Sequence, residues 1–239
     1  MAISLSKIEE TAPALVSLYK SAGASVERLG LGDECAAVYL VLDYSGSMRP
    51  YYQDGTVQAL ADRVLGLAGH FDDDGRVPVV FFSTDVDAET EIEIGDHQGR
   101  IGRIVSGLGH MGRTNYHLAM DAVIDHYLDS GADDPALVIF QTDGGPSSRQ
   151  AAERYLCKAA GLPMFWQFVG FGDPHSKQFD FLRKLDELPV PQKRPVDNAG
   201  FFPAGRDPRR VPDMTLYDRL LGEFPLWLTA ARARGIVRS

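Results

Sequence analysis

The sequence predicts an α/β fold, a doubly wound and mostly parallel sheet with helices on both faces. Four runs are continuously apolar and rich in β-branched or aromatic residues, which is typical of strands buried on both sides. The segments between these runs have apolar residues at helical spacing, the alternation expected of βαβ crossovers. With 239 residues, 44% of them hydrophobic and 24% charged, the chain is long enough to bury one large core.

The predicted strands follow from the apolar runs in chain order. Central strands are expected at residues 36–43 (AAVYLVLD), 77–83 (VPVVFFS), 135–143 (PALVIFQTD) and 162–172 (LPMFWQFVGFG). The alternating stretch TEIEIG at 90–95 predicts a short edge strand with one wet face, antiparallel to its neighbour. A Pro-rich loop over 188–213 is expected to carry one late short strand around VDNAGFF.

The predicted helices lie between these strands and at both ends of the chain. They are expected within residues 8–28 as two short helices or a kinked one, and within 55–71, 116–128, 147–160, 175–188 and 215–235. Pro225 should break the last of these, because proline lacks the backbone N–H that a helix interior needs. The predicted domains are a helical segment at 1–33, an α/β domain at 34–205 and a C-terminal helical extension at 206–239.

Composition narrows the classes of partner and compartment. The formal charge of −9 and the pI of about 5.1 argue against a nucleic-acid partner, which would call for a basic surface. Cys35 and Cys157 form no CxxC pair, which fits a reducing compartment. No apolar stretch has the length of a signal peptide or a membrane span, so we expect a cytoplasmic protein with no membrane partner.

A group of oxygen-bearing side chains follows the ends of two predicted strands. Asp43, Ser45 and Ser47 stand at alternate positions where the first strand ends, and Gly46 is expected to permit the tight turn between them. Asp143 ends the third long apolar run in the same way, and Thr114 lies in a loop before a helix. If the two strands are neighbours, these five side chains can surround a small divalent cation.

This pattern, DxSxS followed by a loop threonine and a strand-end aspartate, resembles the metal-ion-dependent adhesion site (MIDAS) of von Willebrand factor A (VWA) domains. The whole chain, including ISLSK, VLDYSGSMRP, TNYHLAMDAVIDHY, FWQFVGFG and VDNAGFF, resembles cytoplasmic bacterial VWA proteins of the tellurium-resistance type. The resemblance implies a Rossmann-like VWA fold and a metal site at Asp43, Ser45, Ser47, Thr114 and Asp143. The serines and the threonine would contact Mg²⁺, with Mn²⁺ or Ca²⁺ as alternatives, while the aspartates act through bound water.

The resemblance also implies a function. A partner protein would supply an Asp or Glu to complete the shell of the metal ion, without catalysis. The setting would be tellurite or general stress resistance, with other tellurium-resistance proteins as possible partners.

Other interpretations of the same residues remain open at this stage. A bare DxSxS can be a polar loop in which Ser47 caps a helix. An apolar strand ending in Asp43 also begins Mg²⁺-dependent phosphatases of the haloacid-dehalogenase kind, although their second carboxylate is replaced here by Ser45. GLGHMG at 107–112 matches GxGxxG, but it follows a predicted helix rather than a strand, which disfavours a dinucleotide site.

Overall fold

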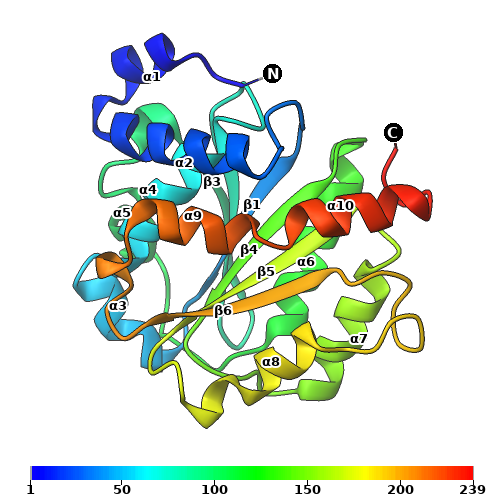
Figure 1. Ribbon diagram of the computed structural model, residues 1–239. Helices are drawn as coiled ribbons and strands as arrows, with labels where there is room; N and C mark the ends of the chain where they lie inside the picture. The colour runs from blue at the N-terminus through cyan, green and yellow to red at the C-terminus, as the bar shows by residue number, and fades with distance from the viewer. Residues whose placement is uncertain (1, 239) are drawn as a thin grey trace.

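The computed structural model describes residues 2–238, and Figure 1 shows a central sheet flanked by helices. In this part of the chain one six-stranded sheet has the order β3-β2-β1-β4-β5-β6. Its strands are β1 (Ala37–Asp43), β2 (Arg76–Phe82), β3 (Val86–Glu93), β4 (Ala136–Thr142), β5 (Met164–Phe171) and β6 (Ala199–Gly205). All neighbouring pairs are parallel except β2 with β3, which confirms the predicted fold class.

The helices connect the strands and extend the domain at both ends. They are α1 (Leu5–Thr11), α2 (Val16–Arg28), α3 (Arg49–Gln53), α4 (Thr56–Ala68), α5 (Arg100–Val105), α6 (Tyr116–Ser130), α7 (Arg149–Ala159), α8 (Asp180–Asp186), α9 (Asp213–Leu221) and α10 (Phe224–Ala233). No helix in the described residues is both long and apolar enough to cross a lipid bilayer.

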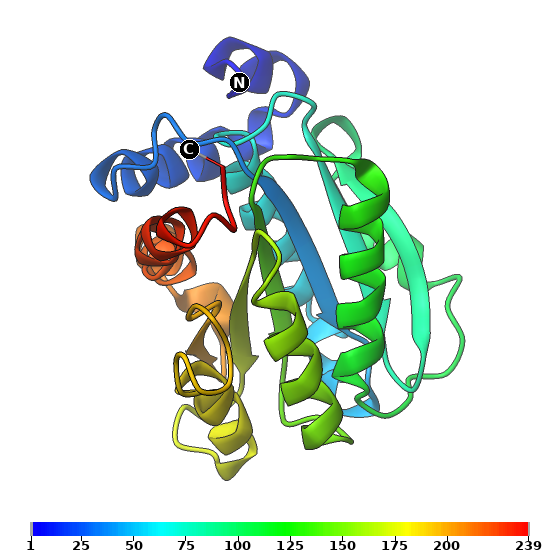
Figure 2. The same cartoon turned by 90° about the vertical axis from the view of Figure 1, so that its right-hand side faces the viewer.

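Alternate residues of the central strands face two separate cores. In β1, Leu40 and Leu42 belong to a core shared with α2, α4, α9 and α10, whereas Tyr39 and Val41 belong to a core shared with α6, α7 and α8. Figure 2 shows these two groups of helices on opposite sides of the sheet. Because side chains of a strand alternate between faces, a strand covered on both sides must be apolar along its length, as β1 is until it ends at Asp43.

The edge strands and the terminal helices agree with the sequence. β3 is the antiparallel edge strand next to β2. β6, which is part of the Pro-rich stretch, forms the other edge of the sheet. Pro225 lies in the first turn of α10 and separates it from α9. Phe224 and Trp227 of α10 are buried and pack against Phe165 of β5, with ring centroids 5.9 and 5.7 Å away.

The strand order also fixes where a ligand is expected. The chain moves outward from β1 in one direction through β2 and in the other through β4, so β1 and β4 flank the point where the order reverses. In open α/β sheets ligands bind outside the carboxyl ends of the strands at this point. Asp43 ends β1 and Asp143 directly follows β4, so the two strands bring the predicted carboxylates to the same edge.

Candidate metal centre

Asp43 is the base of the candidate site and is fully buried. One of its carboxylate oxygens, Oδ1, accepts a hydrogen bond from the backbone N–H of Ser45 at 2.8 Å, a turn in which an aspartate organises the two residues that follow it. The other oxygen, Oδ2, accepts a hydrogen bond from the hydroxyl of Thr142 at 2.7 Å. Both carboxylate oxygens are therefore occupied, and the side chain holds the loop in place.

The two serines connect Asp43 to the second carboxylate. The hydroxyls of Ser45 and Ser47 lie 3.2 Å apart, and Ser47 donates to Oδ1 of Asp143 at 3.0 Å. Ser45 is nearly buried, Ser47 is exposed and Asp143 is partly exposed. The structure thus brings four of the five predicted ligands together, in a chain that runs from the sheet edge to the surface.

Thr114 lies on the adjacent loop and is positioned through its backbone. Its N–H donates to the hydroxyl of Ser147 at 3.3 Å, and its carbonyl oxygen accepts from the N–H of Ser147 at 2.7 Å. Two residues earlier, Gly112 forms a parallel bridge with Ser45. Because only two residue steps join them, the Cα of Thr114 lies at most about 7 Å from that of Gly112. Within residues 2–238 the Thr114 hydroxyl forms no hydrogen bond, so the structure places this residue beside the other four without a side-chain hydrogen bond to them.

Gly112, rather than Gly46, is the glycine that the site requires. A Cβ on Gly112 would lie 2.5 Å from Oγ1 of Thr84 and 3.0 Å from the Thr84 backbone nitrogen. A Cβ on Gly46 would meet nothing within 4 Å, and its backbone is not in the left-handed region. The expectation that Gly46 permits a close approach is therefore wrong, because the approach is made by the loop that carries Thr114.

The electrostatics of the site leave two carboxylates without a basic partner. Burial raises the pKa of Asp43 to about 7, against the opposing effect of the hydrogen bonds from Ser45 and Thr142. Burial likewise raises the pKa of Asp143, and the hydrogen bond from Ser47 lowers it. No Lys, Arg or His of the described residues contributes to either shift. A bound cation would supply the missing positive charge.

The donor set fits a hard divalent cation. It consists of carboxylate and hydroxyl oxygens, which suit Mg²⁺, Mn²⁺ or Ca²⁺ rather than the softer ions that select thiolate or imidazole. Residues 2–238 contain no cluster of three or more His, Cys, Asp or Glu side chains that could hold a metal. The predicted set of ligands is of a different kind, since it combines two carboxylates with three hydroxyls.

Three residues outside the predicted set support the site. Thr142 donates to Asp43, and the hydroxyl of Tyr116 donates to Thr142 at 3.1 Å. Tyr52 donates to the backbone oxygen of Asp43 at 2.9 Å. No sequence motif marks Thr142, which comes to lie beside Asp43 because the register that pairs Leu42 of β1 with Gln141 of β4 continues to the ends of the two strands.

Comparisons with known proteins show the family of this chain. Residues 35–237 match the family described as the vWA domain found in the TerF C terminus. The chain is similar to YcbR of Bacillus subtilis (strain 168), with 36% identity over 223 residues, which are 92% of this chain and 88% of YcbR.

Solved structures share the fold at low sequence identity. The manganese-loaded TRAP protein of Plasmodium vivax has a TM-score of 0.52 and 20% identity over 80% of this chain and 74% of its own. Proximal thread matrix protein 1 of the mussel byssus has a TM-score of 0.53 and 17% identity over 78% of this chain, which spans only 48% of the mussel chain. Another structure of that mussel protein has a zinc-occupied MIDAS motif. From the family match and the relative at 36% identity, this chain belongs to the vWA-TerF-like family of von Willebrand factor A domains.

Proposed function

We propose that this protein is a divalent-metal-dependent protein-binding module without catalytic activity. The observation that carries the proposal is a pair of carboxylates, Asp43 and Asp143, joined through the backbone N–H of Ser45 and the two serine hydroxyls and without any basic partner in residues 2–238. The zinc-occupied MIDAS of the mussel protein and the manganese-loaded TRAP structure support a divalent metal ion in a protein of this fold.

In this proposal the hydroxyls of Ser45, Ser47 and Thr114 hold the metal ion directly, and the two aspartates act around it. Asp43 is suited to an indirect role because both of its oxygens already accept hydrogen bonds. When bound, the ion supplies an electron-poor centre, since neutral hydroxyls donate little charge. A partner's Asp or Glu would then complete its coordination. Mg²⁺ is the expected ion, with Mn²⁺ and Ca²⁺ as alternatives.

The burial and the hydrogen bonds of Asp43 disfavour phosphoryl transfer with this residue as the nucleophile. An attacking carboxylate needs a free oxygen that faces the substrate, whereas Asp43 is fully buried and bonded at both oxygens. The position two residues later, where a second carboxylate would act as acid and base, is the nearly buried Ser45.

We also propose a bacterial, cytoplasmic setting in tellurite or stress resistance. The family description, which names TerF, and the Bacillus relative support it. Other tellurium-resistance proteins are the partners to be tested first.

Isothermal titration with Mg²⁺, Mn²⁺ and Ca²⁺ tests the metal site. We expect the wild type to bind at least one of these ions, and Ser47→Ala and Asp143→Ala to weaken that binding at least about tenfold. Asp129→Ala is the matched control, since it removes an exposed carboxylate from the last turn of α6. The proposal is wrong if the wild type binds no divalent ion or if Asp143→Ala binds as tightly as the control.

Acid recognition and the absence of catalysis need separate measurements. A short peptide with one Glu should bind only when the metal is present, and the same peptide with Gln should not bind. A phosphatase assay with Mg²⁺ should show no turnover above background. Turnover that Asp43→Asn abolishes would replace the binding proposal with phosphoryl transfer.

A further inference from the structure

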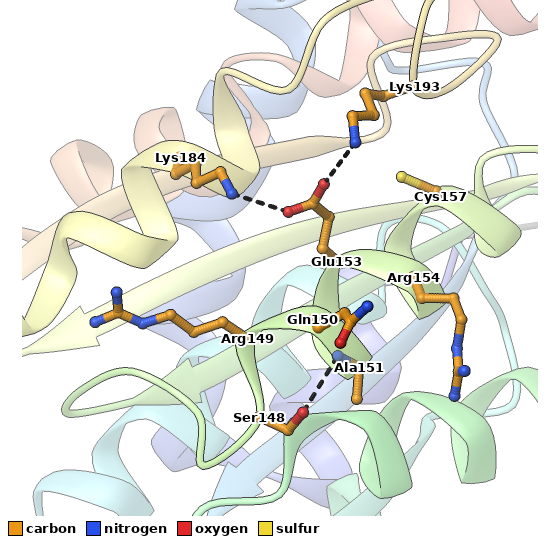
Figure 3. A pocket seen from close by; sticks show the side chains of 9 residues that line it. All are labelled: Ser148, Arg149, Gln150, Ala151, Glu153, Arg154, Cys157, Lys184 and Lys193. Carbon is orange, nitrogen blue, oxygen red and sulfur yellow. Dashed lines mark hydrogen bonds and ion pairs between the residues drawn. The ribbon is translucent and has the colours of Figure 1, made fainter.

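A wide groove runs between α7 and α8 on the face of the molecule away from the terminal helices. Its volume is about 910 Å³. Figure 3 shows the side chains that line it, which are Ser148, Arg149, Gln150, Ala151, Glu153, Arg154, Cys157, Lys184 and Lys193. Four of these carry a positive charge and one a negative charge, in a protein whose net charge is −9. We call Arg149, Arg154, Lys184 and Lys193 the basic groove.

The four cations of the basic groove are not equally available to a ligand. Glu153 is only 19% exposed and pairs with Lys184 at 3.0 Å and with Lys193 at 3.3 Å, so it partly neutralises both lysines (Figure 3). Arg149 and Arg154 are exposed and form no ion pair within residues 2–238. Arg149 lies over the ring of Phe181 on α8, with its guanidinium carbon 5.9 Å from the ring centroid. These two arginines are the free charges of the groove.

Two further unpaired arginines stand next to the predicted metal ligands in the sequence. Arg49 follows Ser47 by two residues, Arg113 immediately precedes Thr114, and both are exposed without an ion pair in the described chain. Most other arginines of this acidic protein are paired, as Arg63 is with Asp213 at 2.8 Å. Four of the six arginines without an ion pair in the described residues therefore stand next to the predicted ligands or in the basic groove, and the other two are Arg219 and Arg234.

The groove is continuous with the metal centre along the chain. Ser147 holds the Thr114 loop through two hydrogen bonds, and the next residue, Ser148, both caps α7 and lines the groove. Ser148 is five positions after Asp143, a span of at most about 18 Å, and the eleven residues of α7 are about 16 Å long. An extended segment of about ten residues could therefore reach from the metal centre to the far end of the groove.

We propose that the basic groove binds further acidic residues of the same partner segment whose Asp or Glu completes the metal shell. This inference rests on the proposed function and adds the chemistry of the partner: an extended protein segment of about ten residues with several carboxylates. The metal binds one residue of the segment. Arg149 and Arg154 select for negatively charged residues in the part of the segment that lies along α7.

A protein segment fits these charges better than a nucleic acid does. Nucleic-acid binding of useful affinity takes contacts to many phosphates, and the groove offers two free cations and two that are already paired. Beyond the groove the net charge of −9 would repel a long polyanion. A short acidic segment interacts only with the positive charges of the groove and is too short to reach the acidic surface beyond it.

The test is the affinity of a labelled ten-residue peptide with alternating Glu and small residues, measured by fluorescence anisotropy with Mg²⁺ and with chelator. The groove variant is Arg149→Gln with Arg154→Gln. The matched control is Lys7→Gln with Lys20→Gln, which changes the net charge equally on α1 and α2, at the opposite end of the molecule (Figures 1 and 2). The site variant is Asp143→Ala.

We expect the groove variant to bind the peptide about twofold to thirtyfold more weakly than the control, with unchanged metal affinity and a weaker dependence on salt. Chelator and the site variant should abolish specific binding of the peptide. A groove variant that binds like the control would refute the groove while leaving the metal centre intact. Peptide binding that ignores chelator but needs the arginines would refute the proposed function instead. An oligonucleotide of equal length that binds more tightly than the peptide would overturn the assignment of the partner class.

Discussion

The most direct test of the site's architecture is the substitution Gly112→Ala. The added Cβ would lie 2.5 Å from Oγ1 of Thr84, 2.8 Å from Oγ of Ser83 and 3.0 Å from the Thr84 backbone nitrogen. Thr84 cannot easily give way, because its Oγ1 accepts from the N–H of Arg113 at 3.0 Å and its carbonyl accepts from the Asn115 amide at 2.7 Å. The loop that carries Gly112 should therefore move away from Ser45.

The magnitude follows from overpacking in a fixed environment, which costs about 1–3 kcal/mol in the free energy of unfolding. For a chain of this size, that corresponds to a fall in melting temperature of about 2–12 °C. Loss of the Ser45–Gly112 bridge should also separate Thr114 from the serines and weaken metal binding. Urea denaturation of the metal-free protein measures the first effect, and isothermal titration measures the second.

Gly46→Ala is the matched control, because it adds the same methyl group to the residue that follows Ser45, the bridge partner of Gly112. Its Cβ would meet nothing within 4 Å, so stability should stay constant or rise by up to about 1 kcal/mol through the less flexible unfolded chain. Metal affinity should not change. If Gly112→Ala proves as stable as Gly46→Ala and binds metal equally well, the close packing of the two loops does not hold the site together.

Three further predictions concern groups behind the site and at the far end of the sheet. Thr142→Val should lower the free energy of unfolding by about 1–3 kcal/mol at neutral pH, since it leaves Oδ2 of the buried Asp43 without a donor, whereas Thr142→Ser should restore most of the loss. Burial, reinforced by nearby carboxylates, raises the pKa of Asp186 to about 7. Its stabilising contribution is therefore complete below about pH 4 and is lost as the pH rises through 7, so Asp186→Asn should flatten stability over this window. Arg194→Ala should destabilise the fold by about 3–5 kcal/mol, because the buried guanidinium donates to the backbone oxygens of Asp186 and Leu188 and to the Asn198 side chain.

Each of these has an outcome that would contradict it. Equal stability of the Val and Ser variants at position 142 would mean that the hydroxyl does not serve Asp43. A pH profile that Asp186→Asn leaves unchanged would assign the titration to another group. For Arg194, Lys is the informative comparison, since it keeps the charge but not the forked donor geometry, and full rescue by Lys would exclude the fork as the cause.

Apolar patterning was sufficient to predict the sheet and most helices because burial on both faces leaves a continuous signal. The runs that became β1, β4 and β5 are buried along nearly their whole length. Their adjacency could not be read from the runs themselves, and the prediction that Asp43 and Asp143 meet was conditional on it. The parallel pairing of β1 with β4 satisfies that condition.

The parts of the site that the sequence did not reveal are those that depend on contacts between distant loops. Gly112 matters because residues 83 and 84, nearly thirty positions earlier in the chain, lie against it. Thr142 matters because the register of two strands sets it beside Asp43. A motif records which residues approach a ligand, whereas the residues that hold them are found only from the pairing of the strands and the packing of the loops.

The unpaired charges around the metal centre also lead to a thermodynamic prediction. Asp43 and Asp143 lack basic partners, although Arg49 and Arg113 stand within a few residues of the predicted ligands in the sequence. The carboxylates and the arginines are therefore available to different ligands. A cation satisfies the carboxylates, and an acidic segment satisfies both that cation and the arginines. If one segment does both, metal and peptide must each raise the other's affinity by the same factor, because coupling between two binding equilibria is reciprocal. Titrating Mg²⁺ with and without saturating peptide, and peptide with and without saturating Mg²⁺, measures that factor twice. Unequal factors would show that the peptide also binds away from the metal centre, and a factor of one would separate the two sites altogether.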